Sequence, residues 1–145
     1  MSDALTQDLL RDENLKLKPY RDTVGKLTIG VGRNIDDNGI TEEEALFLLK
    51  NDIRRSESDL DRNASWWRGL PDDAQRGLVN MAFNIGWPRL AKFDRMLMAL
   101  KFGRFNTAAD EALDSQWAKQ VKGRAERIAD LYRKCDDTHS KAGDA

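Results

Sequence analysis

Three side chains near the N-terminus have the chemistry to split a glycosidic bond. Glu13, Asp22 and Thr28 follow one another at spacings of nine and six residues. The residues between them have the pattern of a strand, a tight Asp-Thr-Val-Gly turn and a second strand, and such a hairpin brings distant residues to one place. Glycoside hydrolysis needs one carboxyl that holds a proton for the departing sugar oxygen and a second, ionised carboxylate that activates water or stabilises the transition state.

The full string over residues 11–33, RDENLKLKPYRDTVGKLTIGVGR, resembles the N-terminal signature of the phage-type lysozymes, glycoside hydrolase family 24. In that signature the pattern E-x(8)-D-x(5)-T is followed by I-G-x-G, which here occupies residues 29–32. The resemblance continues through most of the chain. It implies that Glu13 is the general acid, that Asp22 is the second carboxylate and that Thr28 positions the attacking water.

The same resemblance implies a set of substrate contacts. Two of these residues, Met96 and Glu111, depart from the small polar side chains that are usual at their positions, so the subsites there are expected to differ. An aromatic ring such as Phe83 suits the apolar face of a sugar. The residues expected to contact saccharide or peptide are Asn34, Phe83, Asn84, Met96 and Glu111.

Ion pairs are also expected to support the site. Arg33 stands where relatives often carry His, and an alternative interpretation is that all of these side chains are solvated surface charges. The pairs that the resemblance implies are Arg33 with Asp52, Arg124 with Glu13, and Arg127 with Asp12.

The pattern along the chain predicts an α+β fold in one bilobed domain, and the resemblance implies that this is a lysozyme-like catalytic domain over residues 1–135. Thr41-Glu-Glu-Glu44 is a capping box that opens a long amphipathic helix. Further helices are expected from Pro71 to a break at Gly86. The expected parts are a β-lobe over about 14–40, a linking helix over about 41–62, a helical lobe over about 63–135 that includes the N-terminal helix, later helices near 90–101, 105–114 and 122–134, and a polar tail over 136–145.

Composition excludes several other classes of function. The single cysteine, Cys135, allows no intrachain disulfide, and the single histidine, His139, leaves no zinc or histidine-based site. We therefore expect no metal and no cofactor. The acidic pI of about 5.9 and the lack of a nucleic-acid motif argue against nucleic acid as a partner. No apolar run approaches the ~20 residues that span a bilayer, so no stable membrane association is expected.

The start of the chain has no basic segment followed by an apolar one, so it does not have the pattern of a secretory signal. The protein is expected in the host cytoplasm, as a monomer, and the resemblance implies a holin that releases it to the wall. Residues 34–73 carry 5 basic and 11 acidic side chains, whereas residues 74–134 carry 12 basic and 6 acidic ones. A cationic C-terminal half suits an anionic wall polymer, although ordinary helix-face charge explains it equally well.

Together these observations predict an endolysin. The expected activity is that of a muramidase, which hydrolyses the β-1,4 bonds between N-acetylmuramic acid and N-acetylglucosamine in bacterial peptidoglycan for host cell lysis. One alternative is a lytic transglycosylase, which needs a single acidic catalyst and would not require Asp22 or Thr28. The other is a catalytically silent peptidoglycan-binding module, whose usual signature would be the loss of Glu13 or Asp22, and both are present.

Overall fold

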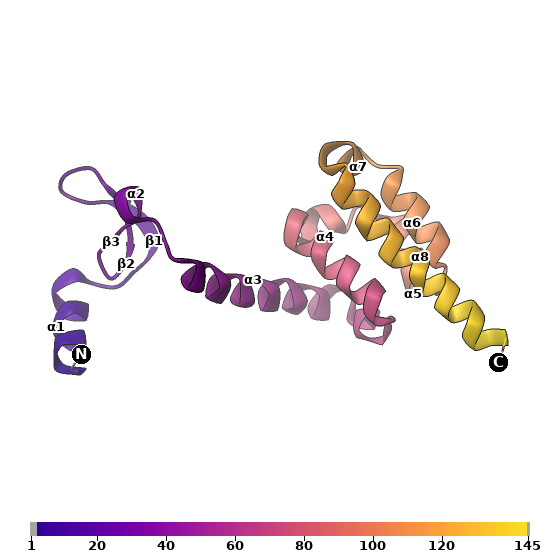
Figure 1. The fold of residues 1–145 in the computed structure, drawn as a ribbon, viewed down its shortest axis with the longest axis horizontal. Helices are drawn as coiled ribbons and strands as arrows, with labels where there is room; N and C mark the ends of the chain where they lie inside the picture. The colour runs from indigo at the N-terminus through magenta and orange to yellow at the C-terminus, as the bar shows by residue number, and fades with distance from the viewer. Residues whose placement is uncertain (1–2, 145) are drawn as a thin grey trace. The chain divides into compact units, whose positions relative to one another are not determined.

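The computed structural model describes residues 3–144, and the side chains of residues 3–136. The chain divides into two compact units, Met1–Leu48 and Leu49–Ala145. Helix α3 (Glu42–Asn63) begins in the first unit and continues into the second (Figure 1). Its ends lie within one residue of those of the helix expected over 41–62.

The first unit carries a small antiparallel sheet with the strand order β1-β2-β3. Thr28 occupies the centre of this sheet, because it pairs with Tyr20 on one side and with Asn34 on the other. The elements of this unit that precede α3 are α1 (Asp3–Glu13), β1 (Lys16–Arg21), β2 (Leu27–Gly30), β3 (Arg33–Asn34) and α2 (Ile35–Asn38).

The start of α3 has the predicted capping box. The backbone N–H of Glu44 donates to Thr41 Oγ1 at 3.1 Å, and the backbone N–H of Thr41 donates to Glu44 Oε1 at 2.8 Å. Two donors that the first helical turn cannot satisfy internally therefore have side-chain partners. This prediction from the sequence is confirmed.

The second unit is helical. Gly86 interrupts α4 with a backbone at φ 76° and ψ 160°, which confirms the predicted break. Helix α7 was not expected, and Ser115 accounts for its start, because its Oγ accepts the backbone N–H of Ala118 at 3.1 Å. The elements that follow α3 are η1 (Ser65–Gly69), α4 (Asp72–Leu90), α5 (Asp94–Lys101), α6 (Phe105–Leu113), α7 (Gln116–Val121) and α8 (Gly123–Asp144).

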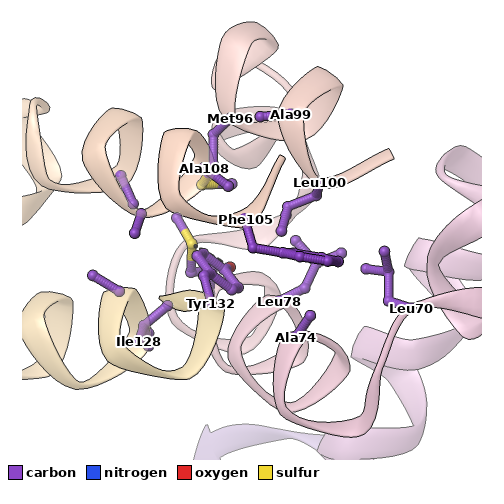
Figure 2. Close-up of a cluster of buried hydrophobic side chains, with 14 of the residues drawn as sticks. Leu70, Ala74, Leu78, Met96, Ala99, Leu100, Phe105, Ala108, Ile128 and Tyr132 are labelled. Carbon is purple, nitrogen blue, oxygen red and sulfur yellow. Dashed lines mark hydrogen bonds between the residues drawn. The ribbon is translucent and has the colours of Figure 1, made fainter. Parts of the chain in front are cut away.

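The core of the second unit forms where α8 packs against α4 and α6. Tyr132 of α8 and Leu78 of α4 are fully buried, and Phe105 of α6 lies with them (Figure 2). Gly77 makes room for the tyrosine ring, since a Cβ at that position would lie 2.8 Å from Tyr132 Cε1. Burial raises the pKa of the Tyr132 phenol above its usual range.

The predicted α+β class is confirmed, because residues 3–144 form a three-stranded sheet and the helices α1 to α8. The segment expected as a polar tail, over 136–145, is helical as far as Asp144. It forms part of helix α8, and no proline interrupts it. The side chain of His139 lies outside the part of the chain whose side chains are described.

Candidate active site

Glu13 is the last residue of α1, and its side chain is exposed. The helix ends there because Asn14 has a φ of 62°, a left-handed conformation that asparagine tolerates better than most residues. The carboxyl lies directly against the backbone of Gly32, where a Cβ would be 2.8 Å from Glu13 Oε2. The predicted general acid therefore reaches the turn between β2 and β3.

Asp22 opens the turn between β1 and β2, and its side chain holds that turn together. Its Oδ1 accepts the backbone N–H of Val24 at 3.0 Å and that of Lys26 at 2.8 Å. The backbone adds further bonds, from Asp22 N–H to the Lys26 carbonyl at 2.9 Å and from Gly25 N–H to the Asp22 carbonyl at 3.0 Å. This is the local geometry for which Asp is favoured at turns, and it fixes the orientation of the carboxylate.

Thr28 is buried, with 3% of its surface exposed. Its hydroxyl donates to the carbonyl of Lys26 at 2.9 Å. Because a hydroxyl has one proton and two lone pairs, Thr28 can contact water only as an acceptor while this bond persists. The backbone of Lys26 thus holds both Asp22 and Thr28. The role of Thr28 in positioning water stays a prediction.

Two acidic side chains of α2, Asp36 and Asp37, contact this hairpin. Asp36 Oδ2 accepts the backbone N–H of Leu27 at 2.6 Å, and the Lys26 ammonium donates to Asp37 Oδ1 at 3.0 Å. The hydrogen bond and charge of Lys26 lower the pKa of Asp37, and Asp37 raises the pKa of Lys26. The turn that carries Asp22 is therefore tied to the helix that follows the sheet.

The expected Arg33–Asp52 pair joins residues of different units and stays a prediction, but Arg33 has another partner within its own unit. The Arg33 guanidinium donates to both oxygens of Glu44, at 2.9 Å and 2.5 Å, and also to the carbonyl of Gly39 at 3.2 Å. Asp52 instead lies 4.0 Å from Arg55, one turn along the same helix. Glu44 is in the first turn of α3 and belongs to the same unit as Arg33, whereas Asp52 belongs to the other unit.

The other two expected ion pairs join residues of different units, and they stay predictions. Within the first unit, Asp12 accepts a hydrogen bond from Arg11 at 3.1 Å. Within the second, Arg124 donates to Asn80 Oδ1 at 2.9 Å. Arg127 lies on the same helix as Arg124, one turn further on, and its guanidinium approaches Gly123.

Asn34 has a structural task in the first unit. Its Oδ1 accepts the backbone N–H of Asp37 at 3.0 Å, and its amide nitrogen donates to Asp37 Oδ2 at 2.9 Å. The side chain therefore caps α2 through both of its polar groups. A contact between Asn34 and sugar stays a prediction.

Phe83 lines a hollow of about 550 Å³ in the second unit. The phenyl ring is 41% exposed, which is high for an aromatic residue on a helix with a buried face. Asn80, one turn earlier on α4, and Arg124 contribute polar groups to the same hollow, and its apolar wall includes Ile53 and Val79. An exposed ring beside amide and guanidinium donors is compatible with sugar binding, as predicted for Phe83.

Met96, Glu111 and Trp117 line a second hollow of about 480 Å³ in the same unit. Met96 is 1% exposed, so it belongs to the core as well as to the lining of this hollow. Asn84 contacts one of the lining residues of this hollow, because its Oδ1 accepts the indole N–H of Trp117 at 2.8 Å. The structure therefore groups three of the predicted substrate residues around Trp117 and places Phe83 in a different hollow.

Sequence reasoning missed two residues that the site depends on. Glu44 was identified only as a helix cap, although a carboxyl at the first helical turn after a hairpin Arg is a recognisable signal for an ion pair. Nothing in the sequence marks Lys26, because its contacts with the two functional side chains are made by backbone atoms, which every residue type has.

Among the described residues, no group of three or more His, Cys, Asp or Glu side chains is placed to hold a metal ion. None of the described helices has a stretch both long and apolar enough to cross a bilayer.

Comparison with known proteins identifies relatives over most of the chain. The family model described as phage lysozyme matches residues 11–135. The pre-baseplate central spike protein Gp5 of Enterobacteria phage T4 is 34% identical over 153 residues, which cover 86% of this chain and 27% of the spike protein. The probable T4-type lysozyme 2 of Dictyostelium discoideum is 26% identical, over 91% of this chain and 95% of its own length. The chain thus spans about a quarter of the spike protein and nearly all of the lysozyme.

Proposed function

We propose that this chain, which belongs to the phage lysozyme family, hydrolyses the β-1,4 bond between N-acetylmuramic acid and N-acetylglucosamine in bacterial peptidoglycan. Family membership makes it a lysozyme-type glycoside hydrolase. The observation that best supports the finer assignment is that all three candidate groups contact the backbone of the same small unit, at Lys26 and at Gly32. Asp22 and Thr28 hydrogen-bond to the backbone of Lys26, and the Glu13 carboxyl rests on Gly32.

The chemistry follows from these positions. Glu13, exposed at the end of α1, donates its proton to the leaving sugar oxygen. Asp22 accepts two backbone N–H bonds at Oδ1, which leaves Oδ2 to act on water or on the positive charge of the transition state. Thr28 accepts a hydrogen bond from the attacking water, because its own proton is given to the Lys26 carbonyl.

The first test compares Glu13→Gln with the wild type in a lysis assay on permeabilised Gram-negative cells. Glutamine keeps the size of the side chain but cannot donate the proton, so activity should fall ~100-fold or more. Glu42→Gln is the matched control, since Glu42 is an exposed residue of the first turn of α3. Activity of Glu13→Gln above about a tenth of the wild-type value would contradict the assignment.

The second test separates hydrolysis from the lytic transglycosylase alternative. Hydrolysis adds water and gives a free reducing end at N-acetylmuramic acid, whereas transglycosylation gives an anhydro sugar that is lighter by one water. Mass spectrometry of the products of purified peptidoglycan should find the reducing sugar. A product that is mainly the anhydro sugar would support the transglycosylase.

We also propose that the biological role is host cell lysis and that a holin gives the enzyme access to the wall. Cells that produce this chain alone should remain intact until their inner membrane is permeabilised, and the catalytically impaired Glu13→Gln chain should not lyse them even then. Lysis by the wild-type chain alone, without permeabilisation, would contradict the dependence on a holin.

A further inference from the structure

Gly30 and Gly32 have similar φ angles but different surroundings. Their φ angles are 73° and 69°, in the region that favours glycine. A methyl group added to Gly30 would meet nothing within 4 Å. A methyl group added to Gly32 would lie 2.8 Å from Glu13 Oε2, 3.0 Å from Cδ and 3.3 Å from Cγ. Only Gly32 therefore has a side-chain neighbour, and that neighbour is the candidate acid.

The strand ends fix the position of Gly32. The residues on either side of the turn pair across it, since Ile29 is opposite Arg33 in the antiparallel ladder. Arg33 is held in turn by both oxygens of Glu44 and by the carbonyl of Gly39. The turn is thus anchored at its base, whereas Glu13 is an exposed side chain at the end of a helix. Of the two, the carboxyl of Glu13 is the group that would move.

We propose that Gly32 is a positioning residue for Glu13: the absence of a side chain at Gly32 leaves the space in which the Glu13 carboxyl sits. The inference rests on the proposed role of Glu13 as the general acid. A methyl group at residue 32 would displace the carboxyl from the leaving oxygen. A misplacement of about 1 Å in a catalytic group can cost ~100-fold in rate.

The test compares Gly32→Ala with Gly30→Ala. Both substitutions place an alanine at a positive φ, so both carry a similar backbone strain, but only Gly32→Ala meets Glu13. The kcat of Gly32→Ala on soluble peptidoglycan fragments should fall at least ~10-fold below that of Gly30→Ala, with KM unchanged within about twofold. An equal loss of kcat in the two variants would overturn the proposal.

Thermal unfolding gives a measurement that does not depend on catalysis. Moving the exposed Glu13 carboxyl costs little stability. Gly32→Ala should therefore lose only slightly more in Tm than Gly30→Ala, and this excess should vanish in a Glu13→Ala background, because the clash then has no partner. An excess that persists in the Glu13→Ala background would overturn the proposal. If the excess vanishes but Glu13→Gln retains full activity, the contact is right and the proposed general acid is wrong.

Asparagine provides a second pair of variants if the alanine chains do not fold. Asparagine tolerates a positive φ better than alanine does and still carries a Cβ. Gly32→Asn should lose more kcat than Gly30→Asn, and the difference in Tm between them should again depend on Glu13. Equal kcat values and equal Tm values for Gly32→Asn and Gly30→Asn would overturn the proposal, as they would for the alanine variants.

Discussion

Arg33 binds Glu44 through two parallel hydrogen bonds, at 2.9 Å and 2.5 Å, and so joins the last strand of the sheet to the first turn of α3. The same carboxylate accepts the backbone N–H of Thr41 and closes the capping box. These contacts, led by the one with Arg33, lower the pKa of Glu44 to about 2. A single side chain therefore fixes both the helix start and the end of the sheet near Gly32.

Glu44→Gln should reveal this pair as a pH-dependent part of the stability. The folded-state pKa of Glu44 lies below its usual value of 4.5, so the contribution is complete above about pH 5 and is lost as pH falls through 4.5 toward 2. Glutamine can still bind the Thr41 N–H, so the cap is retained. Thermal melts from pH 7 to 2 should show a gap between wild type and Glu44→Gln that closes in acid.

Arg33→Gln provides the matched control, because it removes the other half of the same pair. Its gap from the wild type should close over the same pH range. If the curves of wild type and Glu44→Gln remain parallel down to pH 2, then the pair does not stabilise the folded state.

Asp22 is expected to serve structure and catalysis through different atoms. Asp22→Asn keeps a carbonyl oxygen for Val24 and Lys26, so the turn should survive while activity falls strongly. Asp22→Ala removes the acceptor for both backbone N–H groups, and the free energy of unfolding should fall by about 1–2 kcal/mol. Chemical denaturation and lysis assays on both variants make the comparison. An equal loss of stability in Asn and Ala would mean that the side chain does not hold the turn.

The structural and the catalytic roles of the Thr28 hydroxyl can also be separated, by comparing a Val with a Ser variant. Thr28→Val keeps the shape of a residue that is 3% exposed but leaves the Lys26 carbonyl without its donor, which should cost about 1 kcal/mol of stability. Thr28→Ser keeps the hydroxyl and loses a methyl group. If the hydroxyl positions the attacking water, Ser should retain far more kcat than Val at a similar Tm. Equal kcat values for the two would remove Thr28 from the mechanism.

Local patterns predicted the parts of the fold that depend on neighbouring residues. Thr41 and Glu44 stand at capping-box spacing, and the break in α4 falls at Gly86, where helical backbone geometry ends. Such features can be predicted because they depend on hydrogen bonds and torsion angles within a few residues. Ser115 carried the same kind of signal for α7, but a helix of one to two turns has too little apolar periodicity to be recognised.

The partners of the functional residues were harder to predict. Glu44 has a role as a helix cap that its spacing from Thr41 predicts, but that spacing does not show that Glu44 also binds Arg33 of the sheet. The pairing of Asn84 with Trp117 joins residues 33 positions apart, which no local pattern encodes. Residue type identified the candidate groups, while chain geometry determined what each one contacts.

Phe83 and Asn84 are neighbours on α4 with different surroundings. Phe83 is 41% exposed, so Phe83→Ala should raise KM with little change in stability if the ring contacts sugar.

Asn84→Ala instead leaves the indole N–H of Trp117 without an acceptor. Because Trp117 is only 3% exposed, this loss should cost about 1–3 kcal/mol of stability. In a Trp117→Phe background that cost should largely disappear, because the donor is gone. Denaturation of the four chains of this cycle measures the coupling, and additive losses would show that the bond between Asn84 and Trp117 contributes nothing.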